Sequence, residues 1–172
     1  MFSRPDHSEY AEFYRTYVDP MPDDDILDQL SRQRDVTTSY LSGLTAEQAG
    51  HRYESGKWSP REVLGHLTDA ERVFALRALW FARGDGAPLP GFDENAWAAR
   101  SNADQRSMAG LVEEFDAVRT ANIALFRGFD ADAGARIGTA SGKQCSVRAL
   151  IWIIGGHERH HIKILRERYF PV

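Results

Sequence analysis

Apolar residues recur every three to four positions over four long stretches of this chain, which is the spacing of an amphipathic α-helix. The pattern predicts helices over residues 24–42, 59–83, 107–127 and 146–169. A shorter amphipathic stretch over residues 8–17 precedes them. No segment alternates convincingly with a period of two residues, so the pattern predicts no β-strand and an all-α fold.

The second predicted helix has the clearest start in the sequence. Ser59 can cap it, Pro60 takes the first helical position, and Glu62 completes a capping box three residues after the cap. Gly84 ends this helix, since glycine commonly follows a helix C-terminus. These signals fix where the helix starts, and therefore how far along its axis each later residue lies; this distance is called its depth.

Four long helices in a chain of 172 residues predict one domain, residues 1–172, built as a four-helix bundle. The link between the second and third helices, residues 84–106, is too long for a tight hairpin. A crossover of this length allows those two helices to run parallel. A long loop can also form a pocket wall or a lid, or can pack on the bundle or at a subunit interface, and the sequence does not separate these roles.

Two histidines stand out in the last predicted helix. His157 and His161 are four residues apart, so both imidazoles lie on one helix face about one turn apart. That face also carries Leu150, Ile153 and Ile154, whereas Glu158, Arg159, Lys163 and Arg166 are expected on the opposite side. The histidines therefore belong to the buried stripe. They are either core side chains bonded to polar neighbours or two ligands of a metal ion.

His66, in the second helix, is a candidate third ligand. It lies seven residues into its helix, about 10 Å from the start, and His161 lies about 12 Å from the end of the last helix at the standard rise. The depths match if these two helices are antiparallel. Three histidine nitrogens leave a coordination position open, which is typical of a catalytic metal site. The sequence thus predicts one divalent metal ion on His66, His157 and His161.

Other candidates carry weaker signals. Asp69 could orient a histidine, although a salt bridge with an arginine is the alternative. Cys145 precedes the last helix, where the helix dipole would favour a thiolate, but no base accompanies it. His160 falls at the edge of the buried stripe, either in a pocket or half-exposed. Residues 138–143, GTASGK, superficially resemble a phosphate-binding loop but have the wrong spacing and no expected strand before them.

Composition narrows the partners. The net charge is −4 and no Lys/Arg-rich run stands out, which argues against nucleic acid or an anionic membrane as a partner. The longest apolar run, residues 149–154, is too short to span a bilayer, and no apolar signal region opens the chain. Cys145 is the only cysteine, so no intrachain disulfide can form. We expect a cytoplasmic protein.

Four segments of the chain resemble one family. They are GKWSPREVLGHLTDAER (residues 56–72), RALWFARGD (77–85), LPGFDEN (89–95) and GHERHH (156–161). Together they resemble the signature of the DinB-like superfamily of metal-binding four-helix bundles, over roughly residues 10–169. The resemblance implies an up-down-down-up bundle, frequent homodimers, and a divalent metal, zinc or nickel among others, on His66, His157 and His161.

The family resemblance also implies an activity. Characterised members include transferases that use low-molecular-weight thiols such as bacillithiol or mycothiol, and a thiol-dependent maleylpyruvate isomerase. We therefore expect a metal-dependent transferase whose partners are a small-molecule thiol and an electrophile. The alternatives are a metal-dependent hydrolase and a non-catalytic bundle that binds a metal or senses a ligand. No residue identifies the general base or selects a particular thiol, so the catalytic residues stay unassigned.

Overall fold

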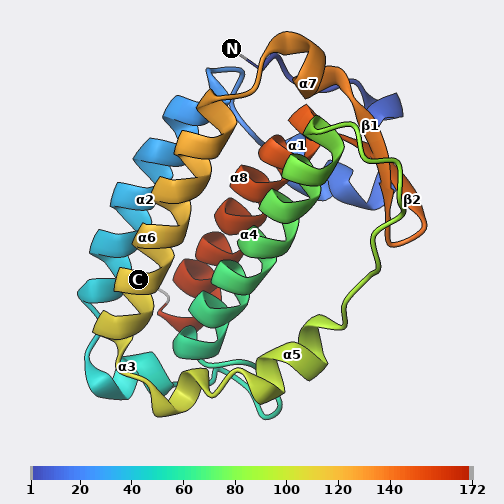
Figure 1. Cartoon of the computed structure of the whole chain (residues 1–172). Helices are drawn as coiled ribbons and strands as arrows, with labels where there is room; N and C mark the ends of the chain where they lie inside the picture. The colour runs from blue at the N-terminus through green and yellow to red at the C-terminus, as the bar shows by residue number, and fades with distance from the viewer. Residues whose placement is uncertain (1, 171–172) are drawn as a thin grey trace.

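Four long helices run side by side in the computed structural model, which describes residues 2–170 (Figure 1). They are α2 (Ile26–Ser42), α4 (Pro60–Ala82), α6 (Met108–Arg127) and α8 (Val147–Ile164). In chain order the first and last point one way and the middle two point the other way. This is the predicted up-down-down-up four-helix bundle, with α4 antiparallel to α8 and parallel to α6.

The predicted helix starts are confirmed to within two residues. Asp25, Ser59, Ser107 and Ser146 cap the four long helices, and the side chain of each accepts a hydrogen bond from a backbone N–H of the first turn. Ser59 and Glu62 form the expected capping box. The last helix continues as one π-helical turn, Leu165–Tyr169.

Helix α8 is the most enclosed of the four. It packs against α4, α2 and the short helix α1 (Arg15–Val18), and its residues from position 149 to 158 are all buried. The prediction that one face of this helix is polar is wrong for Glu158, which is buried at 2% exposure. A helix covered on three sides has no polar face over its central turns, whatever its periodicity indicates.

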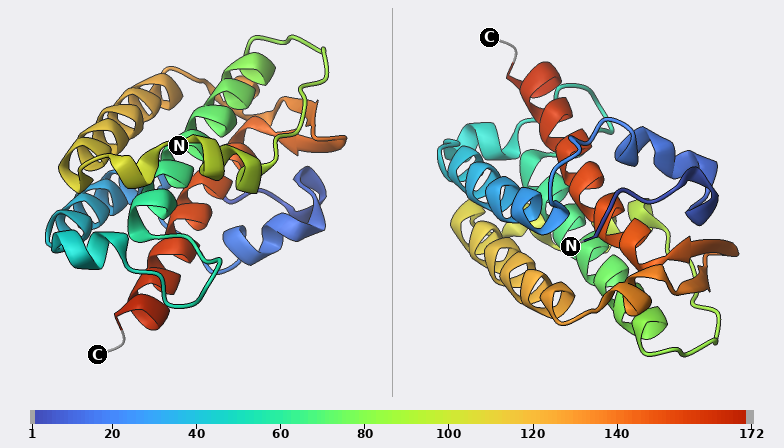
Figure 2. Two further views of the ribbon diagram at one scale, coloured as in Figure 1. Left: turned by 90° about the horizontal axis from the view of Figure 1, so that it is seen from below. Right: turned by 90° about the horizontal axis from the view of Figure 1, so that it is seen from above.

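The crossover between α4 and α6 runs along the length of the bundle, so these two helices are parallel, as its length allows (Figure 1). It contains α5 (Glu94–Arg100) and a 3₁₀ turn, Ala103–Gln105. The two end-on views show α5 close to one end of the bundle and the blue N-terminal segment, which contains α1, beside α8 (Figure 2). The N-terminal segment contacts α8 from Arg148, which pairs with Glu9, to His157, which lies against Tyr17, whereas α5 contacts α4.

The structure corrects the prediction that the chain has no strands. Strands β1 (Ile137–Ala140) and β2 (Lys143–Ser146) form an antiparallel hairpin, with Ile137 opposite Ser146. Each strand has four residues, which is too short to show a clear alternation. The phosphate-loop-like residues are this hairpin, and its turn is Ser141-Gly142, both with positive φ.

The predicted helix over residues 8–17 is also corrected. Two 3₁₀ turns, His7–Glu9 and Glu12–Tyr14, precede α1, because Tyr10 is extended at φ −153° and interrupts the helix. Two further short helices that periodicity could not show are α3 (Ala46–Gly50) and α7 (Ala131–Ala135). Within residues 2–170, no helix is both long enough and apolar enough to cross a membrane.

Candidate metal centre

His66, His157 and His161 meet between α4 and α8. The Nε2 atom of His157 lies 3.0 Å from Nε2 of His66 and 3.1 Å from Nε2 of His161. One ring nitrogen from each of the three lies within 4.8 Å of the other two. The depth match inferred from the sequence therefore brings all three predicted residues together. No carboxylate or thiol of the described residues belongs to this cluster.

The three imidazoles are neutral at pH 7. Burial lowers the pKa of His66 to about 4 and that of His161 to about 3. The pKa of His157 is also well below its ordinary value, first because of burial and then because of its histidine neighbours. A neutral imidazole keeps one nitrogen lone pair, which is the form that binds a metal.

The donor set fits a divalent metal ion. Imidazole nitrogens bind zinc at about 2.1 Å, so two nitrogens on one ion lie roughly 3.0 to 3.4 Å apart. The observed separations of 3.0 and 3.1 Å match that range. A cation among the three rings would accept all three lone pairs, whereas hydrogen bonds between the rings cannot satisfy them together. Nickel also accepts imidazole ligands, so the donor set does not select the metal.

Aromatic side chains enclose the histidines. The Trp58 ring lies 4.8 Å from the His66 ring centroid and stacks on His161 at 6.5 Å. Tyr17 of α1 stands edge-on to His157 at 5.3 Å and to His160 at 5.4 Å. The Tyr169 hydroxyl donates a hydrogen bond to the Trp58 carbonyl and so fixes that loop.

A cavity of about 400 Å³ opens over the histidine cluster. Its wall contains six aromatic rings, from Phe13, Tyr14, Tyr17, Trp58, Phe74 and Phe92. Its other polar groups outside the cluster are Arg77, Glu94, Ser141 and His160. Because Phe92 and Glu94 belong to the crossover, that loop forms a wall of the cavity. His160 both lines the cavity and is exposed, which combines the two alternatives for this residue.

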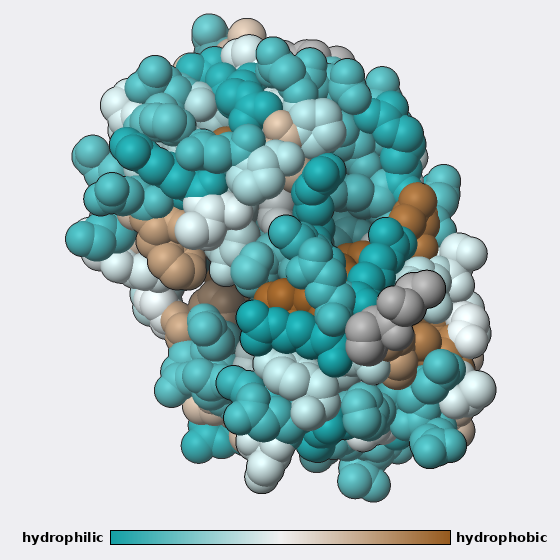
Figure 3. All heavy atoms as spheres, turned by 180° about the vertical axis from the view of Figure 1, so that it is seen from behind, coloured by the Kyte–Doolittle hydropathy of each residue, from teal (hydrophilic) through white to brown (hydrophobic). Residues whose placement is uncertain are grey.

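A second groove, of about 560 Å³, runs between α2 and α8. It is larger, but its lining includes Arg159, Lys163 and Glu158 and none of the three clustered histidines. The face opposite that of Figure 1 is largely hydrophilic, and hydrophobic side chains appear mainly inside its recesses (Figure 3). Since all three clustered histidines line the smaller cavity, we assign the site there.

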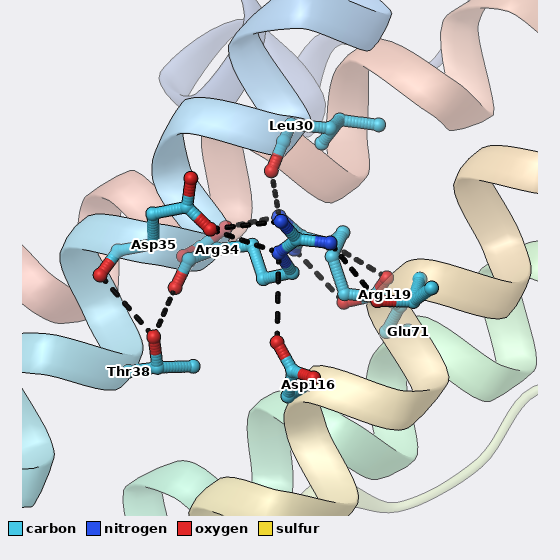
Figure 4. A network of polar contacts seen from close by, with 9 residues as sticks. Leu30, Arg34, Asp35, Thr38, Glu71, Asp116 and Arg119 are labelled. Atoms are coloured by element: carbon cyan, nitrogen blue, oxygen red, sulfur yellow. Dashed lines mark hydrogen bonds and ion pairs between the residues drawn. The ribbon is translucent and has the colours of Figure 1, made fainter.

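A buried ion network lies beside the histidines. Arg119 of α6 donates two hydrogen bonds to Glu71, at 2.7 and 2.8 Å, and one to Glu158 at 2.7 Å. It also reaches the Leu30 carbonyl at 3.2 Å, and Thr37 donates to Glu158 at 2.6 Å. Figure 4 shows the Arg119 side chain between Leu30 and Glu71. Two carboxylates against one guanidinium give this network an excess of negative groups next to a site suited to a cation.

The structure decides between the alternatives for Asp69 and Cys145. Asp69 lies 3.7 Å from Arg72, so the salt-bridge alternative is the one observed. Cys145 is buried at 4% exposure, and burial raises the pKa of its thiol to about 12. It does not line the cavity. The thiolate considered from its place before the last helix is therefore absent at neutral pH, because loss of solvent outweighs the helix dipole.

The sequence interpretation missed Trp58, Tyr17, Phe74 and Arg77 as cavity residues. Arg77 carried a usable signal, since eleven residues after His66 is just over three turns and places both on one helix face. Tyr17 carried no such signal, because its position depends on how α1 packs on α8.

Comparison with known proteins agrees with this architecture. The family model described as DinB superfamily matches residues 29–165. The chain belongs to the DinB superfamily. This DinB-superfamily chain superposes on YfiT from Bacillus subtilis with a TM-score of 0.71 at 18% identity, over 95% of this chain and 89% of YfiT. YfiT is described as a probable metal-dependent hydrolase with an unusual four-helix bundle topology. At that identity the likeness shows the fold alone.

Two curated relatives match part of this DinB-superfamily chain. One, named putative metal-dependent hydrolase, is from Geobacillus kaustophilus and is 36% identical over 63 residues. The other, with the same name, is from Geobacillus thermodenitrificans and is 34% identical over 74 residues. The matches span 35% and 40% of those relatives' own lengths, and 37% and 43% of this chain.

Proposed function

We propose that this protein is a metal-dependent hydrolase of a small organic substrate, with His66, His157 and His161 holding one divalent ion per chain. The observation that carries the proposal is a cluster of three neutral imidazoles at a cavity of about 400 Å³, with no fourth ligand from residues 2–170 in the cluster. Cavities of this size suit small ligands. The names of the two Geobacillus relatives support the reaction class.

A bound divalent ion would supply Lewis acidity, which lowers the pKa of water and polarises the bond to be cleaved. The residues of the chain supply the rest. Trp58, Phe74 and Tyr17 cover the imidazoles and limit the access of bulk water. Burial raises the pKa of Tyr17, so its hydroxyl keeps its proton at neutral pH and can donate a hydrogen bond to a bound substrate.

Thiol transfer is the second candidate reaction. The scarcity of free carboxylates at the cavity favours it over hydrolysis. Among the described residues that line the cavity, Glu94 is the only carboxylate, and it is exposed. The buried Glu71 and Glu158 are both bound to Arg119. Hydrolysis requires a group that returns a proton to the leaving atom. Addition of a thiol to an electrophilic carbon requires chiefly that the sulfur lose its proton, which metal coordination promotes. The partners would be a small thiol and an electrophile.

One set of assays separates these two reactions. Zinc- and nickel-loaded protein is tested against a panel of esters and amides, and against chlorodinitrobenzene and an epoxide with a panel of thiols. The His66→Ala variant removes a proposed ligand, and His51→Ala is the matched control, since His51 packs on Tyr169 and Phe170 away from the cavity. We expect turnover in wild type and His51→Ala only. Background rates with every substrate would contradict both reactions.

The oligomeric state is a separate proposal. We propose a homodimer, on the family resemblance. Light scattering at micromolar concentration tests it, and a monomer mass would contradict it.

A further inference from the structure

Arg77 is a buried guanidinium at the cavity that contains the histidines. Only 3% of its surface is exposed, and the lining of the cavity includes both Arg77 and the three histidines. Arg77 and His66 lie on the same face of α4, and eleven residues at 1.5 Å each separate their Cα atoms by roughly 16 Å. Arg77 and the histidine cluster therefore mark two ends of one elongated cavity.

No carboxylate within residues 2–170 forms an ion pair with Arg77. Its Nη2 atom donates to the Pro90 carbonyl at 2.9 Å and to Ser141 Oγ at 3.0 Å. Its guanidinium carbon lies 5.7 Å from the Phe74 ring centroid. Arg119 is buried to the same degree and binds two carboxylates. One buried arginine of this protein is thus fully paired, and the other lacks an anion.

The acidic groups near Arg77 do not supply the missing charge. The positive charge of Arg77 interacts with Tyr14 and Cys145, but burial raises the pKa of each side chain, so both are neutral at pH 7. Glu94 lines the cavity, yet it is exposed and lies beyond ion-pair distance of Arg77. Burying a cation without a counter-ion costs free energy, and buried charges in proteins are therefore generally paired. A bound anion would pair with Arg77.

Besides a hydrogen-bonding contact with the Tyr14 hydroxyl, Arg77 makes two hydrogen bonds, and together these contacts leave some of its donors free. The two hydrogen bonds both start at Nη2, whereas a guanidinium carries five N–H groups in a planar fork. That fork matches the two oxygens of a carboxylate. Ser141 Oγ, next to Nη2, is a further donor for the same group.

We propose that Arg77 and Ser141 form a carboxylate-binding subsite for the substrate. The substrate is an elongated molecule with a carboxylate at the Arg77 end, an apolar centre against Phe74 and Tyr14, and its reacting group at the histidine end. The assignment of the reacting end rests on the proposed function. The carboxylate subsite rests on the unpaired cation alone.

A binding experiment on zinc-loaded full-length protein tests the subsite without turnover. The probes are 4-phenylbutyrate and its neutral amide, 4-phenylbutanamide, which have nearly the same shape, and calorimetry measures both affinities. The variant Arg77→Met removes the cation, and Arg83→Met is the control, since Arg83 is an exposed arginine at the end of the same helix, outside the cavity. Thermal unfolding verifies that each variant is folded.

We expect wild type and Arg83→Met to bind the carboxylate at least about tenfold more tightly than the amide, as loss of one charged hydrogen-bonding partner predicts. In Arg77→Met the ratio falls to about one while amide binding persists. If Arg77→Met does not fold, Arg77→Lys keeps the charge without the fork, and we expect an intermediate ratio. Equal affinities in wild type, no binding of either probe, or an unchanged ratio in the Arg77 variants would overturn the proposal.

The outcome is independent of catalysis. An Arg77-dependent preference for the carboxylate together with no turnover of any substrate would refute the proposed function and leave the subsite standing. Turnover of neutral substrates with no preference for the carboxylate probe would refute the subsite and leave the proposed function standing. A preference that persists in Arg77→Met would place the carboxylate on the metal instead.

Discussion

The backbone carbonyl of Tyr17 lies against Gly156, where a Cβ atom on that glycine would stand 2.2 Å from the oxygen. Position 156 must therefore be glycine for α1 to approach α8 this closely. The same approach places the Tyr17 ring edge-on to His157, the residue after Gly156. One missing side chain thus fixes both the packing of the N-terminal segment and a wall of the metal cavity.

Replacing Gly156 with alanine should displace α1. Since the clash is with a backbone atom, the neighbour cannot rotate away, and we expect a loss of about 1–3 kcal/mol in the free energy of unfolding. Limited proteolysis should cleave the segment around residues 10–20 faster than in wild type. Gly86→Ala is the control, because nothing lies within 4 Å of the added Cβ. Equal stability of the two variants would contradict the packing argument.

Removing Arg119 should cost much more than removing a surface arginine. Arg119→Met leaves Glu71 and Glu158 buried without their cation, and breaking a buried pair in this way costs about 3–5 kcal/mol. Arg34→Met, which breaks partly exposed pairs with Asp35 and Asp116, should cost about 0–1 kcal/mol. Urea unfolding at pH 7 measures both.

A second set of variants isolates the charge effect. Adding Glu71→Gln and Glu158→Gln to Arg119→Met removes the stranded carboxylates, so part of the lost stability should return. If the triple variant is less stable than Arg119→Met alone, uncompensated charge is not the cause of the loss.

Cys145 should react slowly with iodoacetamide in the folded protein. Burial raises the pKa of its thiol to about 12, so the thiolate is a minute fraction between pH 7 and 9, whereas in the unfolded chain it titrates near 8.5. The folded state therefore prefers the neutral thiol. This contribution to stability is complete below about pH 8.5 and is lost as the pH rises toward 12.

Alkylation rates measured with and without urea test this. We expect the native rate at pH 8 to be at least about a hundredfold below the unfolded rate, from the difference in thiolate fraction. A native rate within a few-fold of the unfolded one would show a reactive, accessible Cys145 and would reopen its role as a nucleophile.

The sequence predicted the four long helices, their order and the histidine cluster because these depend on local signals. Ser59 and its capping box set the depth of His66, and the spacing of His157 and His161 set their shared face. Since helix rise is regular, two correct depths were enough to predict that α4 and α8 are antiparallel and that the three rings meet.

The remaining features depend on contacts between distant segments. Glu158 looked solvent-facing because its partners, Arg119 and Thr37, lie 39 and 121 positions away in the chain. The short hairpin and the break at Tyr10 were missed because four-residue strands and single-turn helices carry almost no periodic signal. Tyr17 enters the site only through the close approach at Gly156.

Metal content tests the central claim most directly, because the account assigns the metal to three particular nitrogens. Purified protein is loaded with zinc or nickel, passed through a desalting column, and analysed by elemental mass spectrometry beside His66→Ala, His157→Ala, His161→Ala and His160→Ala. The last variant is the matched control, since His160 is on the same helix at the same cavity but outside the cluster. We predict about one ion per chain in wild type and His160→Ala and almost none in the other three. Equal metal content in all five proteins, with each variant folded, would contradict the account.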